Sequence, residues 1–272
     1  MTMRTGFILP GGSATEQLEQ AVLAEEAGWG GVFVWEAAYG VDAWSLLSAM
    51  AVRTSRVRLG TLLTPLPWRR PWKLASQVAT LDQLSGGRAV LTVGLGAIDG
   101  LPTTGEVTDR KLRAARMDEG IDLMRTLWSG GRAHHGEHYD YVCPADSPTM
   151  VTPVQARIPI WVAGAWPRPK SMQRVLRCDG IVPEWHLGER EGSPDDVREM
   201  LSWLAERGAR PDLDVISEGE TPAADAAAAA ATVRPWAEAG CTWWLETRWS
   251  APDGPARTLA VRERIEAGPP LA

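Results

Sequence analysis

The segment LGTLLTPLPWRRPWKLASQVATLDQLSGGRAVLTVGLGA, residues 59–97, decides the fold. It begins inside the apolar run Val57–Leu63, which has the length and composition of a buried strand. A proline-containing loop follows, and apolar side chains then recur at helical spacing over Trp72–Leu84. Gly86 and Gly87 end this helix and lead into a second apolar run, Ala89–Val93. The segment therefore predicts two parallel strands joined by a helix.

The same alternation of apolar runs and amphipathic stretches extends along the whole chain. We predict strands at Thr5–Leu9, Gly31–Trp35, Val57–Leu63, Ala89–Val93, Ile158–Ala163, Gly180–Val182, Leu213–Ile216 and Thr242–Leu245. The helices that follow them are predicted at Ala14–Gly28, Ala43–Arg53, Trp72–Leu84, Lys111–Trp128, Arg168–Arg177, Pro194–Arg207, Ala223–Ala239 and Ala256–Ala267. Eight such units favour one α/β domain, residues 1–272, folded as a closed (β/α)8 TIM barrel rather than an open doubly wound sheet.

Residues 129–157 interrupt this alternation and predict an irregular insertion between strands 4 and 5, made of strands or loops that pack on the barrel. The insertion contains His134, His135 and His138. A zinc site needs further ligands at defined spacing, and no cysteine stands near these histidines at such a spacing. We therefore predict solvated histidines and no metal site.

The composition predicts which partners the protein lacks. The 34 acidic residues outnumber the 28 basic ones, which gives a net charge of -6 and argues against a nucleic-acid partner. No apolar run approaches the ~20 residues of a membrane helix, and the N-terminus lacks the apolar core of a signal peptide. The three cysteines are scattered, as expected in a reducing compartment. We predict a cytoplasmic protein with a small-molecule substrate.

Two glycine-containing motifs resemble nucleotide-binding sequences but lack the required context. The loop after the fourth strand has the spacing GxGxxxG, from Gly94 through Gly96 to Gly100, and no helix opens where a dinucleotide fold needs one. The string LSGG at 84–87 is better explained as a helix end, because no phosphate loop precedes it. Gly94 and Gly96 still permit close backbone approach, so we predict that both contact a cofactor.

The segment 59–97 resembles the bacterial luciferase-like monooxygenase superfamily. The stretches AEEAGWGGVFVWE (24–36) and PIWVAGAWPRPKSMQRVLRCDGIVP (159–183) match that family's pattern in the same order. The resemblance implies a (β/α)8 barrel, commonly a homodimer, that binds FMN or the 5-deazaflavin coenzyme F420 at the carboxyl ends of its strands. Members of the family either activate oxygen with reduced FMN or move a hydride to or from the deazaflavin.

The resemblance also implies where the cofactor lies. The flavin ring rests against the end of the third strand, often on a bulge that contains a non-proline cis peptide. The matching residues are Thr61, Leu62, Leu63 and Thr64. The stretch before Pro65 is shorter than in many members, which leaves the presence of the bulge open. The phosphate contacts implied after the fifth strand match Gly164, Ala165 and Trp166.

Catalytic groups of such barrels come from the carboxyl ends of the strands. The charged residues at those positions are Glu36, Glu184, His186, Glu218 and Glu246. Carboxylates buried in a barrel mouth have raised pKa values and can act as acids or bases. We predict Glu36 and His186 as the proton-handling pair and Glu246 as a third candidate, with a structural ion pair or hydrogen bond as the alternative role of each.

One residue departs from the pattern of a subgroup of the family. Deazaflavin-dependent alcohol and sugar dehydrogenases carry an acidic residue followed by histidine after strand 2, whereas this chain has Glu36 followed by Ala37. Another residue must then supply the proton, or the reaction is not alcohol oxidation. The leading hypothesis is a flavin- or F420-dependent oxidoreductase or monooxygenase. A barrel that binds flavin without turnover is the alternative, and a hydrolase or isomerase would need a metal or carboxylate pair that we do not find.

Overall fold

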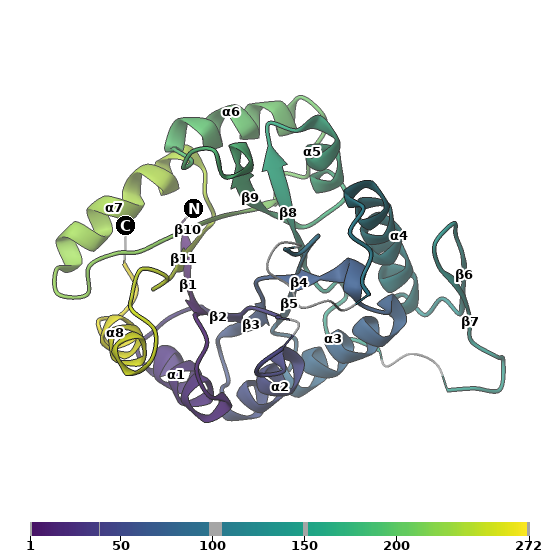
Figure 1. Ribbon diagram of the computed structural model, residues 1–272, viewed down its shortest axis with the longest axis horizontal. Coiled ribbons are helices and arrows are strands. Elements are labelled where there is room, and N and C mark those ends of the chain that lie inside the picture. The colour runs from purple at the N-terminus through teal and green to yellow at the C-terminus, as the bar shows by residue number, and fades with distance from the viewer. Residues whose placement is uncertain (1, 38, 98–104, 149–151, 271–272) are drawn as a thin grey trace.

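The strands of the computed structural model form a closed parallel barrel, which Figure 1 shows as a ring inside a ring of helices. The structure describes residues 2–37, 39–97, 105–148 and 152–270. The barrel strands are β1 (Arg4–Leu9), β2 (Gly31–Val34), β3 (Arg58–Thr61), β4 (Thr64–Pro65), β5 (Ala89–Gly94), β8 (Ile160–Trp166), β9 (Gly180–Trp185), β10 (Asp214–Gly219) and β11 (Trp243–Glu246). Both β3 and β4 pair with β5, so they are two parts of one barrel strand and the pairing closes the barrel. The predicted eight-stranded barrel is confirmed.

The helices follow the strands in sequence and cover the outside of the barrel (Figure 1). They are α1 (Ala14–Glu26), α2 (Ala43–Arg53), α3 (Pro71–Ser85), α4 (Arg110–Trp128), α5 (Pro169–Val175), α6 (Pro194–Ala205), α7 (Ala226–Ala239) and α8 (Pro255–Glu266), with short 3₁₀ turns η1 (Leu66–Trp68) and η2 (His186–Gly188). Local chemistry sets their ends. Ser13 and Glu16 form a capping box at the start of α1, and Gly86 ends α3 in the left-handed conformation.

Successive side chains of each strand point alternately into the barrel and toward the helices. The inward-facing core residues are Ile8, Phe33, Val90, Trp161, Ile216, Trp243 and Leu245. Phe33 stacks on Trp161 at a ring separation of 5.3 Å, and Trp243 meets Trp161 edge-on at 5.5 Å. These aromatic rings fill the middle of the barrel, so an active site is expected above them, at the carboxyl ends of the strands.

The insertion forms a regular antiparallel hairpin, where we predicted an irregular segment. Its strands, β6 (Ala133–His135) and β7 (Asp140–Val142), lie at the outer side of α4 (Figure 1). His134 Nε2 lies 3.3 Å from Glu119 Oε1 of α4, and His135 Nδ1 lies 2.6 Å from Asp140 Oδ1. Both imidazoles are therefore engaged with carboxylates of the hairpin and α4.

Three strands extend three residues further toward their carboxyl ends than the sequence predicted. β8 includes 164–166, β9 reaches Trp185 and β10 reaches Gly219. The extensions contain glycine, proline, serine and glutamate, which are common in loops, together with Trp166 and Trp185, and they keep the backbone pairing of the barrel. Among the described helices, none combines the length and apolar composition needed to cross a membrane.

Candidate active site at the barrel mouth

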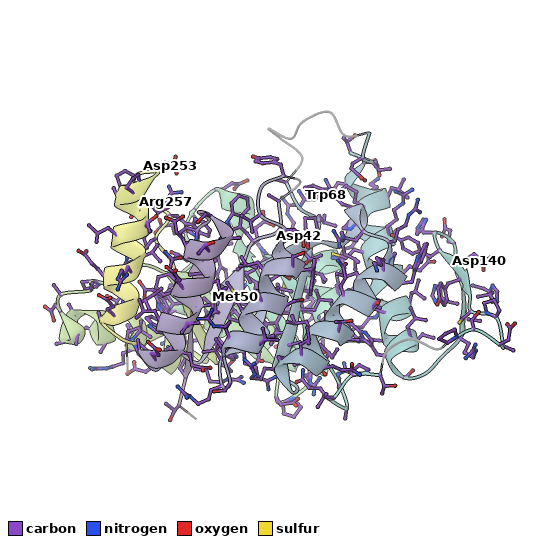
Figure 2. The ribbon with its side chains drawn as sticks, turned by 90° about the horizontal axis from the view of Figure 1, so that it is seen from below. Asp42, Met50, Trp68, Asp140, Asp253 and Arg257 are labelled. Atoms are coloured by element: carbon purple, nitrogen blue, oxygen red, sulfur yellow. The ribbon has the colours of Figure 1, made fainter. Side chains whose placement is uncertain are left out.

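A cavity of about 620 Å³ opens at the carboxyl ends of β4, β5, β8, β9 and β10. Its walls are Leu63, Leu95, Gly96, Ala97, Arg110, Arg113, Ala163, Ala165, Ser171, Arg174, Val182, Pro183, Glu184 and Glu218. In Figure 2, Trp68, Asp42 and Asp253, which follow different barrel strands, lie toward this same end of the molecule. A volume of this size fits a small organic ligand or cofactor.

The end of the third barrel strand forms one wall of the cavity. β3 ends at Thr61 and β4 resumes at Thr64, and the peptide between Leu62 and Leu63 is cis. The bulge that the resemblance implied is therefore present despite the short stretch before Pro65. Leu62 packs on the inner core, whereas Leu63 lines the cavity. This arrangement places apolar surface where a flat ring can lie.

The two predicted glycines allow the loop after β5 to pack against this bulge. A Cβ atom on Gly94 would lie 2.7 Å from Leu63 Cδ2, which is too close for a stable contact. Gly96 has φ +75°, and a Cβ there would lie 2.7 Å from the Cβ of Pro65. Gly96 also lines the cavity, so its backbone is within reach of a bound ligand.

Arginine side chains from α4 and α5 give one side of the cavity a positive charge. Arg113 is 1% exposed, and its Nη2 donates to the backbone oxygen of Leu95. Its Nε has no hydrogen-bond partner among the described residues. Arg174 binds Asp118 with Nε and Nη2 at 2.5 and 2.8 Å, and Arg110 is exposed at the start of α4. Guanidinium groups in such a setting suit a phosphate or carboxylate ligand.

A carboxyl group lies at the opposite side of the same cavity. Glu218 stands two residues after the inward-facing Ile216 on β10, so it also points into the barrel. The Glu218 side chain is open to solvent at the mouth, and partial loss of solvation by the surrounding protein raises the pKa of Glu218 above the ordinary glutamate value. We considered Glu218 among the charged strand ends but did not select it as catalytic. Its two-residue spacing from Ile216 was the signal that could have identified it.

Glu36 lies in a separate pocket of about 340 Å³ beside the mouth cavity. Its Oε2 accepts hydrogen bonds from Thr64 Oγ1 at 2.6 Å and from Trp44 Nε1 at 3.1 Å. Its Oε1 lies 2.9 Å from Arg69 Nη1. Thr64 Oγ1 is also 2.9 Å from Thr61 Oγ1, so the carboxylate is tied to the bulge. The structure thus places Glu36 in an ion pair next to the predicted ring position.

His186 is not brought near Glu36. The strands that precede them, β9 and β2, are four barrel strands apart in either direction around the barrel, so they lie on opposite sides of it. His186 Nε2 lies 3.2 Å from Asp196 Oδ1 of α6. Asp196 also binds Arg190, which lowers the pKa of its carboxyl group. The structure therefore does not bring Glu36 and His186 together as the pair that we predicted.

Glu246 points away from the mouth, contrary to the position we expected for it. Its side chain is fully buried between β11 and α8, because it faces outward from the barrel. Arg248 Nη1 lies 2.8 Å from Oε1, Arg264 Nε lies 3.4 Å from the same oxygen, and Thr221 donates from its backbone and hydroxyl at 2.7 Å. These partners hold Glu246 as a structural carboxylate.

The predicted phosphate residues of β8 divide between the two faces of the strand. Ala165 lines the cavity, whereas Trp166 packs against Trp203 of α6 at a ring separation of 6.2 Å. Gly164 faces α5, and a Cβ there would lie 2.9 Å from Ile181 Cδ1. The backbone N–H of Ala165 already donates to Ser171 Oγ at 2.9 Å. The hydroxyl of Ser171 is therefore the polar group that this segment presents to the cavity.

Comparison with known proteins gives a consistent result over most of the chain. The family described as luciferase-like monooxygenase matches residues 2–264. A putative coenzyme F420-dependent oxidoreductase of Mycobacterium tuberculosis is 32% identical over 204 residues, which cover 71% of this chain and 56% of that protein. The oxygenase component of a flavin-dependent trigonelline monooxygenase of Acinetobacter baylyi is 29% identical over 153 residues, covering 53% and 40% of the two chains. The aligned segments thus span about half the length of these relatives.

Among solved structures, an F420-dependent secondary alcohol dehydrogenase in complex with an F420-acetone adduct has the same fold. It superposes with a TM-score of 0.75 over 98% of this chain and 99% of the other, at 19% sequence identity. At that identity the likeness shows the fold alone. The relatives of this chain use either F420 or a flavin as cofactor.

Proposed function

The chain belongs to the luciferase-like monooxygenase family, and we propose that it is an oxidoreductase that binds coenzyme F420 in the mouth cavity and transfers a hydride to or from a small organic substrate. The observation that carries this proposal is the cavity, which joins an apolar bulge, an arginine wall and a carboxyl group with a raised pKa. F420 is preferred to FMN because F420-dependent oxidoreductases are among the relatives of at least 30% identity. FMN-dependent monooxygenation is the alternative outcome.

The residues of the cavity fit a deazaflavin or a flavin. Both cofactors combine a flat ring system with a phosphate group, and this cavity offers an apolar wall and a cationic wall. Arg110, Arg113 and Ser171 would hold the phosphate, because all three side chains line the cavity and can donate hydrogen bonds to an anion. The ring would rest against Leu63 of the bulge. The bound cofactor would supply the hydride chemistry.

Two carboxyl groups then have different roles in the proposal. Glu218 handles the substrate proton, because its raised pKa lets it hold a proton nearer to neutral pH than an exposed glutamate does. Glu36 forms an ion pair with Arg69 and positions Thr64 at the bulge through its hydrogen bond. Ala37 stands where deazaflavin-dependent dehydrogenases of the family carry a histidine. In this proposal Glu218 of β10 acts as the proton-handling group instead.

The test is a titration of the purified protein with F420, reduced F420, FMN and reduced FMN under anaerobic conditions, followed by absorbance. We expect F420 to bind and to be reduced or re-oxidised when a panel of small alcohols, ketones and enones is added. Oxygen-dependent oxidation of bound reduced FMN together with substrate would instead support monooxygenation. Absence of binding by all four cofactors would contradict the proposal, and so would tight binding without turnover on any substrate.

The arginine wall offers a matched control. Arg110→Ala should weaken cofactor binding by roughly tenfold, because a charge-assisted hydrogen bond to phosphate is lost. Lys111→Ala removes the same charge from the neighbouring exposed position, which does not line the cavity, and should leave the Kd unchanged. Equal effects of both substitutions would point to general electrostatics and against a phosphate site at Arg110.

Two further expectations accompany this function. The resemblance implies a homodimer, which light scattering of the purified protein at several concentrations would test. The cytoplasmic location also stays a prediction from the sequence. A monomer that retains cofactor binding would show that the mouth cavity is complete in one chain.

A further inference from the structure

The bulge that lines the mouth cavity is held from its outer side by Glu36. The hydroxyl of Thr64 donates to Glu36 Oε2 at 2.6 Å. Thr64 Oγ1 also lies 2.9 Å from Thr61 Oγ1, so this contact joins the two ends of the bulge. The backbone N–H of Glu36 donates to the backbone oxygen of Leu63 at 3.4 Å. Glu36 therefore contacts the bulge through its side chain and through its backbone.

Arg69 fixes the orientation of this carboxyl group. Its Nη1 lies 2.9 Å from Glu36 Oε1, and its Nη2 donates to Gln77 Oε1 of α3 at 2.5 Å. The Glu36 side chain is 9% exposed, so the ion pair is largely removed from water, where a charged contact is stronger than at the surface. The other carboxyl oxygen accepts from Thr64 and from Trp44 Nε1. Arg69 thus connects the bulge to α3 through Glu36.

The position of Leu63 matters because the cofactor ring of the proposed function rests against it. A glutamate side chain has several rotatable bonds, so Glu36 without its partner on Oε1 would be free to turn away from Thr64. The bulge would then lose a hydrogen bond on its outer side and gain freedom to move. Displacement of a reacting group by about 1 Å can lower a rate on the order of 100-fold. The orientation of Glu36 is therefore expected to affect the reaction more than the binding of the cofactor.

We propose that Arg69 is a positioning residue for the reaction: by orienting Glu36 it fixes the bulge, and with it the place where the cofactor ring rests. The inference rests on the proposed function, because only a ring bound against Leu63 gives the bulge this role. Arg69 is absent from the lining of the mouth cavity, so it acts through Glu36 and Thr64 and not by contact with the cofactor.

The surroundings of Arg69 allow this role to be tested by chemical rescue. Arg69 and Glu36 both line the separate pocket of about 340 Å³ beside the mouth. Removal of the Arg69 side chain would leave space in this pocket for a small cation next to Glu36. Methylguanidine carries the same planar group as arginine and can form the same pair of hydrogen bonds with a carboxylate. It should therefore restore the orientation of Glu36 in a truncated variant.

The first test needs no cofactor. In the full-length protein with ¹³C-labelled leucine methyl groups, we expect Arg69→Ala to shift the NMR signals of Leu63, which lies on the bulge. Arg69→Lys should shift them less, because it keeps a positive charge beside Glu36. Methylguanidine should return the Leu63 signals of Arg69→Ala toward those of the unmodified protein. Unchanged Leu63 signals in Arg69→Ala would overturn the proposal.

Turnover of the cofactor-loaded protein is the second readout. Arg69→Ala should lower turnover roughly 10- to 100-fold, with recovery in Arg69→Lys and with methylguanidine, while the cofactor Kd stays within about twofold. Thr64→Val removes the hydroxyl that meets Glu36 and should lower turnover by a similar factor. The double substitution should lower it no further, because both changes break the same connection. Effects that multiply would contradict the action of Arg69 through Thr64.

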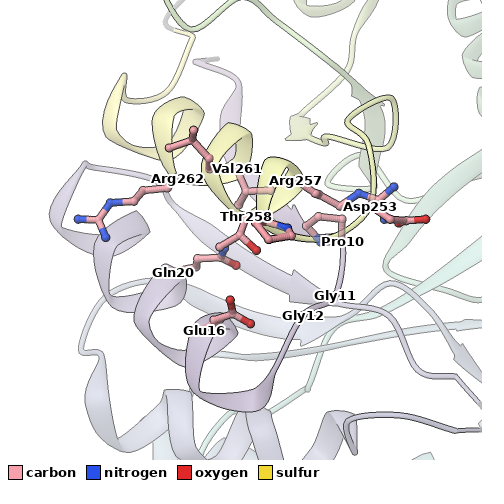
Figure 3. A pocket seen from close by; sticks show the side chains of 13 residues that line it. Pro10, Gly11, Gly12, Glu16, Gln20, Asp253, Arg257, Thr258, Val261 and Arg262 are labelled. Atoms are coloured by element: carbon pink, nitrogen blue, oxygen red, sulfur yellow. The ribbon is translucent and has the colours of Figure 1, made fainter.

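Arg257 provides a matched control. Its Nη1 lies 2.7 Å from Asp253 Oδ1, and its side chain is 25% exposed, against 26% for Arg69. Figure 3 shows Arg257 and Asp253 beside a groove between α1 and α8, outside the barrel. Arg257→Ala should leave turnover and the Leu63 signals unchanged, and equal effects of both arginine variants would contradict the role of Arg69. Absence of cofactor binding would contradict the proposed function, whereas the Leu63 signals would still test whether Arg69 holds the bulge.

Discussion

Glu218 and Glu246 stand at the carboxyl ends of neighbouring strands, but their side chains lie on opposite faces of the barrel wall. In the register of β10 and β11, Glu218 pairs with Leu245 and Gly219 pairs with Glu246. Glu218 points into the barrel and lines the mouth cavity, where loss of solvation raises its pKa. Glu246 points outward and is enclosed by Arg248, Arg264 and Thr221.

The difference between these two glutamates is a shift of one residue along paired strands. Side chains alternate between the faces of a strand, so one position decides between the cavity and the layer under the helices. In the cavity, a carboxyl group without a cationic partner gains a raised pKa and becomes suited to proton transfer. Under the helices, the same group is fixed by two arginines and holds α8 on the barrel. The face of the strand therefore decides the chemistry.

The largest effect is expected at the structural carboxylate. Glu246→Gln should lower the free energy of unfolding by about 3–5 kcal/mol, because removing one partner leaves buried arginine charges uncompensated. Urea unfolding followed by circular dichroism would measure it. A loss below about 1 kcal/mol, the range of exposed ion pairs, would show that Glu246 is not the buried anchor described above.

A double substitution measures how strongly Glu246 and Arg264 stabilise each other. Arg264 approaches Glu246 from α8 and is itself 1% exposed. Glu246→Leu combined with Arg264→Met should cost less than the sum of the two single substitutions, because no unpaired charge remains from that pair. Additive losses would mean that Arg264 and Glu246 do not stabilise each other.

The next effect concerns activity at Glu218. Glu218→Gln keeps the size and polarity of the side chain but removes the proton-handling group, so turnover should fall on the order of 10²-fold while the cofactor Kd stays the same. Steady-state kinetics together with cofactor titration would separate the two quantities. Glu184→Gln is the matched control on the neighbouring strand, because that residue lines the same cavity. Unchanged turnover in Glu218→Gln would remove Glu218 from the mechanism.

The smallest effect is a pH dependence of stability. The pKa of Glu218 is raised on folding, so the folded state binds this proton more tightly than the unfolded state does. The associated stability is present below the ordinary glutamate pKa and is lost as the pH rises through the raised value. Glu218→Gln should therefore stabilise the protein relative to the unmodified chain more at pH 7 than at pH 4. Urea midpoints at both pH values would test this, and a constant difference would contradict it.

The sequence predicted the strands well and the faces of their side chains poorly. Strands of a parallel barrel are buried on both sides, so β11 reads as the apolar run Trp243–Leu245 without the alternation that would reveal a face. That is why Glu246 was expected in the mouth. For β10 the signal was present, because Glu218 follows the buried Ile216 by two residues, but strand ends rich in polar residues are easily taken for loops.

Some of the site residues implied by the resemblance depend on the geometry of a single strand end, and others depend on the arrangement of distant strands. The bulge at 61–64 and its cis peptide are properties of one strand end, and the structure contains them. The pairing of Glu36 with His186 needed knowledge of where β2 and β9 lie around the barrel, which no local pattern contains. Gly164 and Trp166 lie on the same strand as Ala165, yet of these three residues only Ala165 lines the cavity.

The amino-acid sequence by itself determined the eight strand–helix units, because hydrophobic periodicity and the glycines and prolines that end each element are local signals. It also determined the family, because the segment 59–97 keeps a family pattern. Only the tertiary structure decided which strand-end side chains meet. Barrel closure sets which strands are neighbours, and register sets which face each residue occupies. Those two properties arise from pairing between distant segments, so they placed Glu218 with the arginine wall and Glu246 under α8.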